Sequence, residues 1–171
     1  YSITGGKLKY DKEGRLAAKG RINDELLQEL LKHPYLEKKP PKTTGREEFG
    51  TSYSSYILNK YLKKGVSDVD IITTITYFTA KTIADSYKKW ILNHHSFDEV
   101  IIGGGGSYNR TLVKMIRNEL KGIRVLTQEE FGFSSDAKEA VAFAVLANET
   151  IHGNPNNIPK VTGAKKSVVM G

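Results

Sequence analysis

A short apolar run that passes directly into four glycines constrains the fold of this chain more than any other segment. Val100, Ile101 and Ile102 form the run, the glycines occupy positions 103–106, and a helical pattern starts near Asn109. A strand that ends in backbone without side chains, beside a helix start, is typical of α/β proteins whose ligand lies against the main chain. The pattern therefore predicts an α/β fold with a nucleotide site.

The glycine segment matches neither of the two common phosphate-binding loops. No Gly-Lys-Ser/Thr follows it, as a P-loop requires, and Tyr108 stands where a dinucleotide fingerprint needs a small residue. A flat adenosine group pressed against the backbone suits the segment better. A tight turn without a ligand is the alternative, although four consecutive glycines lose much conformational entropy on folding. Because the chain holds no phosphate loop of its own, we interpret the segment as half of a site.

Length and composition limit the classes of protein. The 171 residues are enough for one domain with a hydrophobic core, and no signal peptide or apolar run of about 20 residues is present. The absence of cysteine excludes disulfides and thiolate sites and fits a cytoplasmic protein. The net charge is +7, but the lysines are scattered, which favours solvated faces over a nucleic-acid surface. Both ends of the chain look trimmed.

Capping residues and apolar spacing predict three helices in the first half. Asn23 begins a helix that ends before Pro34. A capping box of Thr44 and Glu47 begins a second helix. Ser67 begins a third, of roughly 23 residues. This third helix should bury one stripe, formed by Ile72, Ile75, Thr79, Ile83 and Trp90.

The second half alternates strands and helices. Short strands are predicted at 99–102 and 123–126, with a helix between them, and an edge strand is predicted around Val161 and positions 168–169. A further helix starts with Asp136 as its cap. Its small-residue face should pack closely, and consists of Ala137, Ala140, Val141, Ala144 and Val145.

Three groups of polar residues are candidates for ligand contact. Asp136 and Glu139 point toward the start of the same helix, although an acid there also stabilises the helix dipole without a ligand. Lys42 and Arg46 flank two threonines and could bind a phosphate or carboxylate, although the capping box of Thr44 and Glu47 explains that segment without a ligand. The four histidines have no ligand spacing, so we expect no metal site.

Four segments carry a family resemblance that covers essentially the whole chain. They are positions 10–14 (YDKEG), 41–47 (PKTTGRE), 102–109 (IGGGGSYN), and 136–144 continuing into 153–164 (DAKEAVAFA, GNPNNIPKVTGA). The last two are specific in combination. On these motifs the chain resembles the C-terminal half of the bacterial anhydro-N-acetylmuramic acid kinase family.

The resemblance implies a place in the sugar kinase, hexokinase and actin superfamily, whose two ribonuclease H-like lobes surround a cleft. Positions 1–171 would form the C-terminal lobe, helix-rich with a small sheet, with an irregular entry and first helix over 1–45 and the core over 46–171. Family members transfer the γ-phosphate of ATP, with Mg²⁺, to the 6-oxygen of 1,6-anhydro-N-acetylmuramic acid in cell-wall recycling. Water opens the anhydro ring in the same turnover.

The resemblance also assigns roles to residues. The adenosine-side motif falls on Gly103, Gly104, Gly105, Gly106, Ser107 and Asn109. Glu139 falls on an acid that faces the sugar, with Asp136 nearby. The family's catalytic aspartate lies in an Asp-Thr-Gly-Pro-Gly motif that should precede Tyr1, so no catalytic residue and no activity are expected of this chain alone. The implied partners are the sugar, the N-terminal lobe and, as a further option, a second copy of the chain, with no nucleic acid and no membrane.

Three other readings stay open. A related sugar or acid kinase would share the glycine run but not the segments at 41–46 and 153–157. A non-catalytic nucleotide-binding or interaction module would bind ATP without turnover. A nucleic-acid-binding protein would show affinity that falls steeply with salt.

Overall fold

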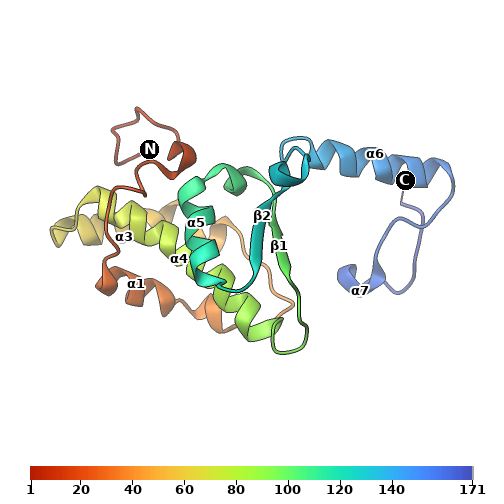
Figure 1. The fold of residues 1–171 in the computed structure, drawn as a ribbon, viewed down its shortest axis with the longest axis horizontal. Coiled ribbons are helices and arrows are strands. Elements are labelled where there is room, and N and C mark those ends of the chain that lie inside the picture. Colours follow the sequence, from red (N-terminus) through yellow and green to blue (C-terminus); the bar gives the residue numbers. More distant parts are fainter. Residues whose placement is uncertain (171) are drawn as a thin grey trace. The chain divides into compact units, whose positions relative to one another are not determined.

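Two compact units make up the part of the chain that the computed structural model describes, positions 1–170. The first unit is Tyr1–Thr127 and the second is Gln128–Gly171 (Figure 1). The first unit combines helices with a two-stranded sheet, so the predicted helix-rich α/β character is confirmed. Within positions 1–170, no helix has both the length and the apolar character that crossing a membrane requires.

Three helices of the first unit begin where the sequence predicts, each with a side-chain cap at the residue before its first turn. Before α1 (Asp24–Leu31), the Asn23 side chain accepts a hydrogen bond from the Leu26 amide at 2.9 Å. Before α4 (Asp68–Trp90), Ser67 accepts from the Asp70 amide at 3.1 Å. The cap of α5 (Arg110–Glu119) is Asn109. Each cap satisfies an amide that the helix itself leaves without a partner.

The helix predicted to start at Thr44 is two helices, and Thr44 does not cap either. α2 (Arg46–Phe49) begins after Gly45, without a side-chain cap, and α3 (Thr51–Lys63) begins after Gly50. A Cβ atom on Gly50 would clash with the carbonyl oxygen of Arg46. The chain therefore breaks the helix at Gly50, where no Cβ atom is present to clash. The capping-box prediction is wrong.

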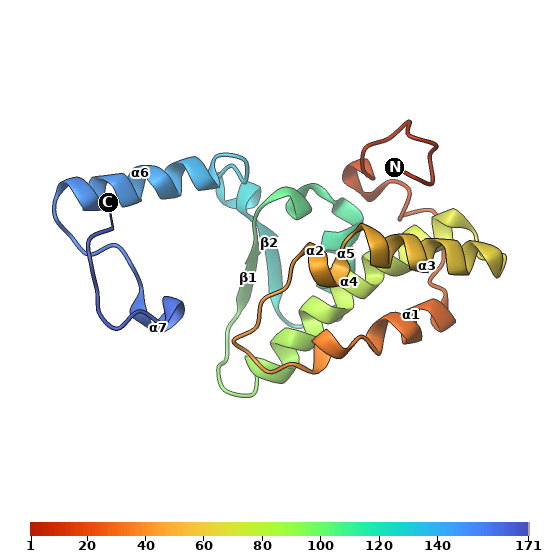
Figure 2. The same ribbon diagram turned by 180° about the vertical axis from the view of Figure 1, so that it is seen from behind.

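The sheet pairs β1 (Glu99–Ile102) with β2 (Arg124–Thr127) in parallel, and α5 connects them. The two strands lie beside α5 (Figures 1 and 2). Val100 lies opposite Val125, and both are buried against residues of α4 and α5. Ile101 points to the other face and is 53% exposed. β2 starts one residue later than the sequence predicts, which is the usual error for an element boundary.

Helix α4 serves two hydrophobic clusters, which explains why its predicted stripe is not the buried one. Ile71 packs with α1 and α3, whereas Ala80 and Ala84 pack with α5 and the sheet. The predicted residues are only half-buried: Ile72, Ile75, Thr79, Ile83 and Trp90. Small side chains at positions 80 and 84 let α5 approach closely, and a search for large apolar residues overlooks them.

The second unit contains η4 (Gln128–Phe131), α6 (Lys138–Ile151) and α7 (Pro159–Thr162). Asp136 is not a cap, because α6 begins after Ala137 without a side-chain cap. The predicted close packing of the small-residue face of α6 is also not found, because no residue of this helix is buried. Val161 lies in α7, and positions 168–169 are not in a strand, so the predicted edge strand is wrong.

Asparagines of the turn after α6 hold the second unit together. The side chain of Asn156 donates to the carbonyl oxygen of Leu146 at 3.0 Å and accepts from the amide of Met170 at 2.7 Å. The Asn157 side chain accepts from the amide of Val168 at 2.8 Å. The Gly-Asn-Pro-Asn-Asn segment therefore ties the end of the chain back to α6.

Candidate functional site

The glycine segment forms the link between β1 and α5. It leaves the sheet at Ile102 and continues through the 3₁₀ turn η3 (Gly105–Tyr108) to the cap residue Asn109. Gly104 has φ +93° and ψ −179°, a conformation that is essentially restricted to glycine. The backbone therefore requires glycine at position 104.

The neighbouring glycines are not explained by the packing of the protein. A Cβ atom on Gly105 would meet no atom within 4 Å, and the φ of this residue is not positive. A Cβ atom on Gly106 would come no nearer than 3.9 Å to the side chain of Leu112. Gly105 therefore lies in open space, and Gly106 would meet only the end of one flexible side chain, as backbone that approaches a ligand would.

Ser107 and Asn109 stabilise the segment from inside. Ser107 is buried, and both its amide and its hydroxyl donate to the carbonyl oxygen of Gly104, at 2.9 and 2.8 Å. The Asn109 side-chain oxygen accepts from the amide of Leu112 at 2.9 Å, which caps α5. The NH₂ group of Asn109 has no partner among positions 1–170 and remains available as a donor.

A loop far away in the sequence braces the start of α5. The carboxylate of Asp11 accepts from the amides of Leu16 and Ala17, at 2.8 and 3.0 Å. This turn brings the carbonyl oxygen of Gly14 to the hydroxyl of Thr111, which donates to it at 2.7 Å. Apart from the family resemblance, the aspartate three residues before a glycine was the local signal for a turn in this segment.

Positive charge gathers at the same end of α5. Arg110 is its first residue and is exposed. The Arg15 guanidinium contacts the carboxylate of Glu13 at 3.0 Å, and this hydrogen bond lowers the pKa of Glu13, with smaller contributions from the charges of Arg110 and Lys12. A helix N-terminus carries a partial positive charge as well. This end of the first unit is therefore suited to an anionic ligand.

The two acidic candidates lie at the start of α6, in the second unit. Glu139 is in the first turn and Asp136 lies in the turn before it, and both side chains are exposed. Neither carboxylate forms a hydrogen bond or an ion pair within positions 1–170. Asp136 is thus not needed to cap the helix, and both carboxylates are free to accept hydrogen bonds.

The third candidate group is separated by the structure. Lys42 turns toward η2 (Pro34–Glu37), where its ammonium donates to the carbonyl oxygens of Tyr35 and Leu36. Arg46 is exposed at the start of α2. The alternative explanation of this segment, a capping box, is wrong, because Thr44 caps no helix.

Known proteins match this chain over nearly its whole length. The family model described as anhydro-N-acetylmuramic acid kinase matches positions 3–171. An anhydro-N-acetylmuramic acid kinase of Caldanaerobacter subterraneus subsp. tengcongensis is 54% identical over 169 residues, which are 99% of this chain and 43% of that protein. One of Bacillus cereus (strain AH820) is 53% identical over 167 residues, 96% of this chain and 43% of that protein. The chain spans less than half the length of these relatives, and it belongs to the anhydro-N-acetylmuramic acid kinase family.

Proposed function

We propose that this chain forms the C-terminal lobe of a two-lobed, ribonuclease H-like sugar kinase that acts in the cytoplasm. The enzyme transfers the γ-phosphate of ATP to the 6-oxygen of 1,6-anhydro-N-acetylmuramic acid, and water opens the anhydro ring. Family membership supports the kinase activity, and the match to 43% of each relative agrees with a chain that forms one of two lobes. The parallel strand pair with a connecting helix agrees with one part of such a lobe.

The nucleotide site in this proposal is the backbone at Gly103, Gly104, Gly105 and Gly106, with Ser107 and Asn109 behind it. The observation that carries it is the open space at Gly105, since nothing in the protein requires glycine there. Adenosine would lie against this backbone. The NH₂ group of Asn109 and the charge of Arg110 would attract the polar and anionic parts of ATP.

The sugar contacts in this proposal are Glu139 and Asp136. Their carboxylates are exposed and have no partner within positions 1–170, so each can accept a hydrogen bond from a sugar hydroxyl. A carboxylate at a helix start is also favoured by the helix dipole. The catalytic base is assigned to the part of the enzyme that precedes this chain.

Mg²⁺ would neutralise the charge that develops on the transferred phosphate. Positions 1–170 contain no group of three or more histidine or carboxylate side chains that could hold a metal ion. Kinase Mg²⁺ is usually held by one or two carboxylates together with the nucleotide phosphates, so it would accompany ATP, and we assign it no ligand in this chain. Phosphoryl transfer needs the nucleotide, the acceptor and the base held together, so this chain alone should be inactive.

The test is an ADP-release assay on the full-length protein with 1,6-anhydro-N-acetylmuramic acid and Mg-ATP, followed by mass spectrometry. The expected product is heavier than the sugar by one phosphoryl group and one water. ADP release that depends on another sugar would instead show a related kinase. ATP binding without any sugar-dependent turnover would indicate a non-catalytic module, and either result would contradict the proposal.

A further inference from the structure

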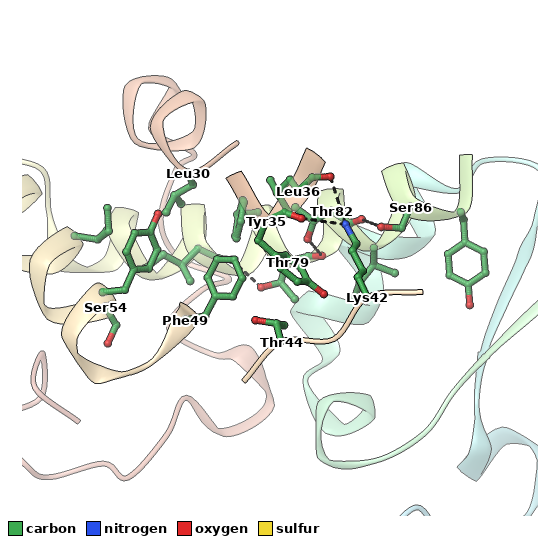
Figure 3. A pocket seen from close by; sticks show the side chains of 16 residues that line it. Leu30, Tyr35, Leu36, Lys42, Thr44, Phe49, Ser54, Thr79, Thr82 and Ser86 are labelled. Atoms are coloured by element: carbon green, nitrogen blue, oxygen red, sulfur yellow. Dashed lines mark hydrogen bonds between the residues drawn. The ribbon is translucent and has the colours of Figure 1, made fainter. Parts of the chain in front are cut away.

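A cavity of about 560 Å³ opens in the first unit, and no residue of the glycine segment lines it (Figure 3). One wall is α4, and the opposite wall comes from η2, the segment that carries Lys42 and Thr44, and helices α2 and α3. The volume falls in the range of pockets that bind small organic molecules, roughly 300–1,000 Å³. The proposed kinase activity gives this cavity no role.

The inner surface of the cavity is apolar and contains several aromatic rings. Phe49 and Tyr53 contribute their rings from α2 and α3, and their centroids are 5.8 Å apart, edge to face. Ile75, Phe78 and Ile83 contribute from α4. Aromatic rings in an apolar lining suit a flat apolar ring system, which can stack on them or meet them edge to face.

Hydroxyl groups on the α4 wall do not make that surface strongly polar. The hydroxyls of Thr79, Thr82 and Ser86 each donate to a carbonyl oxygen of α4, at 3.1, 3.1 and 2.8 Å. Their protons are therefore engaged within the helix, and only their oxygens remain as acceptors. An anionic group of a ligand would gain nothing from these three side chains.

Lys42 supplies the one cation of the cavity lining. Its ammonium donates to the carbonyl oxygens of Tyr35 and Leu36, at 3.2 and 3.3 Å, and lies 4.7 Å from the centroid of the Tyr35 ring (Figure 3). An ammonium has three N–H donors, so one remains. No carboxylate within positions 1–170 forms an ion pair with Lys42.

Acidic residues close to Lys42 are committed to other partners. Asp85 and Glu37 line a neighbouring hollow that Lys42 also borders. Asp85 pairs with Lys81 at 3.1 Å, and Glu37 pairs with Lys89 at 3.9 Å. The half-buried charge of Lys42 is thus not neutralised by the protein, although burial of a charge is favourable only when it is paired.

We propose that this cavity binds a small molecule in which a flat apolar ring system carries a single carboxylate. The ring packs on the aromatic and apolar side chains of the lining, Phe49 and Tyr53 among them, and the carboxylate accepts the remaining N–H of Lys42. The Thr44 hydroxyl, which has no partner within positions 1–170, is a second donor in the lining. One cation and one hydroxyl match a monoanion, whereas phosphate sites usually offer arginine or several backbone amides.

The test uses 1-naphthoate as the probe and 1-naphthamide as its neutral isostere, with calorimetry on the full-length protein and amide NMR shifts on the same sample. We expect saturable binding of 1-naphthoate, at least tenfold tighter than the amide. The shifts should concentrate at Phe49, Tyr53 and Thr79. Lys42→Met should lower the affinity for 1-naphthoate at least tenfold, and Lys42→Arg should retain most of the affinity.

Lys39→Met is the matched control, because Lys39 is exposed in the same segment and does not line the cavity. It should leave the affinity within twofold. Equal affinity for the acid and the amide, an unchanged affinity in Lys42→Met, or no saturable binding would overturn the proposal. The last result would mean that protein covers this surface in the full-length molecule. The comparison of acid and amide decides the question even if Lys42→Met does not fold.

Discussion

The hydroxyl of Thr111 donates a hydrogen bond to the carbonyl oxygen of Gly14 at 2.7 Å, across 97 positions of sequence. The contact is tight, because a Cβ atom on Gly14 would overlap the side-chain oxygen of Asn109 and lie 2.7 Å from the Cβ of Thr111. Asn109 also caps α5 directly after the glycine segment. The loop around Gly14 therefore fixes the residue that ends the proposed nucleotide site.

Gly14→Ala should destabilise the first unit and weaken ATP binding together. Gly14 has φ +70°, so alanine would be strained by about 1–2 kcal/mol there, and its overlap with Asn109 and Thr111 should add about 1–3 kcal/mol. Urea unfolding measures the total. The control is Gly65→Ala, at φ +80° with nothing within 4 Å, which carries the strain alone. An equal loss of unfolding free energy in both variants would show that the close contact of Gly14 with Asn109 and Thr111 does not contribute to stability.

Gly105→Val should weaken ATP binding at least tenfold, which is about 1.4 kcal/mol, and leave the stability unchanged. The added side chain would fill the space over the backbone, and the fold has room for it. Calorimetric titration of the full-length protein with ATP and a thermal melt check the two parts. Gly105→Ala should give a smaller effect of the same sign. Unchanged ATP affinity in Gly105→Val would remove this backbone from the site.

Glu139→Gln should lower kcat by at least tenfold, about 1.4 kcal/mol, with the affinity for ATP unchanged. The carboxylate is placed at the sugar in the proposed function, and the amide keeps its size without its charge. Steady-state kinetics of the full-length enzyme, with ATP titrations alongside, separate the two effects. Glu149→Gln makes the same change near the other end of α6 and should retain full activity. If both variants are as active as the parent, Glu139 has no part in turnover.

Tyr77 and Glu119 join α4 to α5, and this bond should make stability depend on pH. The Tyr77 hydroxyl donates to the carboxylate of Glu119 at 2.6 Å, which lowers the pKa of Glu119 and raises the pKa of Tyr77 to about 12. Tyr77→Phe should cost about 1.5–3 kcal/mol at pH 7, as for other bonds to charged groups. Tyr87→Phe is the control on the same helix, since its hydroxyl makes no hydrogen bond within positions 1–170.

The direction of the pH effect follows from the lowered pKa of Glu119. The stabilisation from ionised Glu119 is complete above its pKa in the unfolded chain, about 4.5. It is lost as the pH falls through the lower pKa of the folded protein. Because the pKa of Tyr77 is raised, its own contribution persists up to about pH 10 and is lost only toward pH 12. The deficit of Tyr77→Phe should therefore be smaller at pH 3 than at pH 7. A constant deficit would exclude the ionised carboxylate as its cause.

Helix starts and the strand before the glycines were predicted correctly, because they depend on residues close together in the sequence. Asn23, Ser67 and Asn109 each cap the helix that they were predicted to begin, because a cap depends on a few neighbouring residues. The strand before the glycines also lies where the apolar run placed it. The place of the glycines between β1 and α5 was therefore predictable without a structure.

The wrong predictions concern features that depend on tertiary packing or on the backbone of a single residue. The sequence pattern predicted one continuous helix, but the chain breaks it at Gly50, where a Cβ atom would clash with the carbonyl oxygen of Arg46. Ala80 and Ala84 carry the buried face of α4 because two elements pack there, which periodicity of large residues cannot show. The bracing of Asn109 by Gly14 joins positions 95 residues apart, and no local pattern could predict it.

The two-stranded sheet has a consequence for handling the chain in solution. Within positions 1–170, β1 and β2 pair only with each other, so each keeps one outer row of amide and carbonyl groups without a strand beside it. Such edges recruit further strands, and Ile101 adds an exposed apolar side chain to one of them. Preparations of these 171 residues alone should therefore self-associate as their concentration rises, with the open edges of β1 and β2 forming the contact between copies.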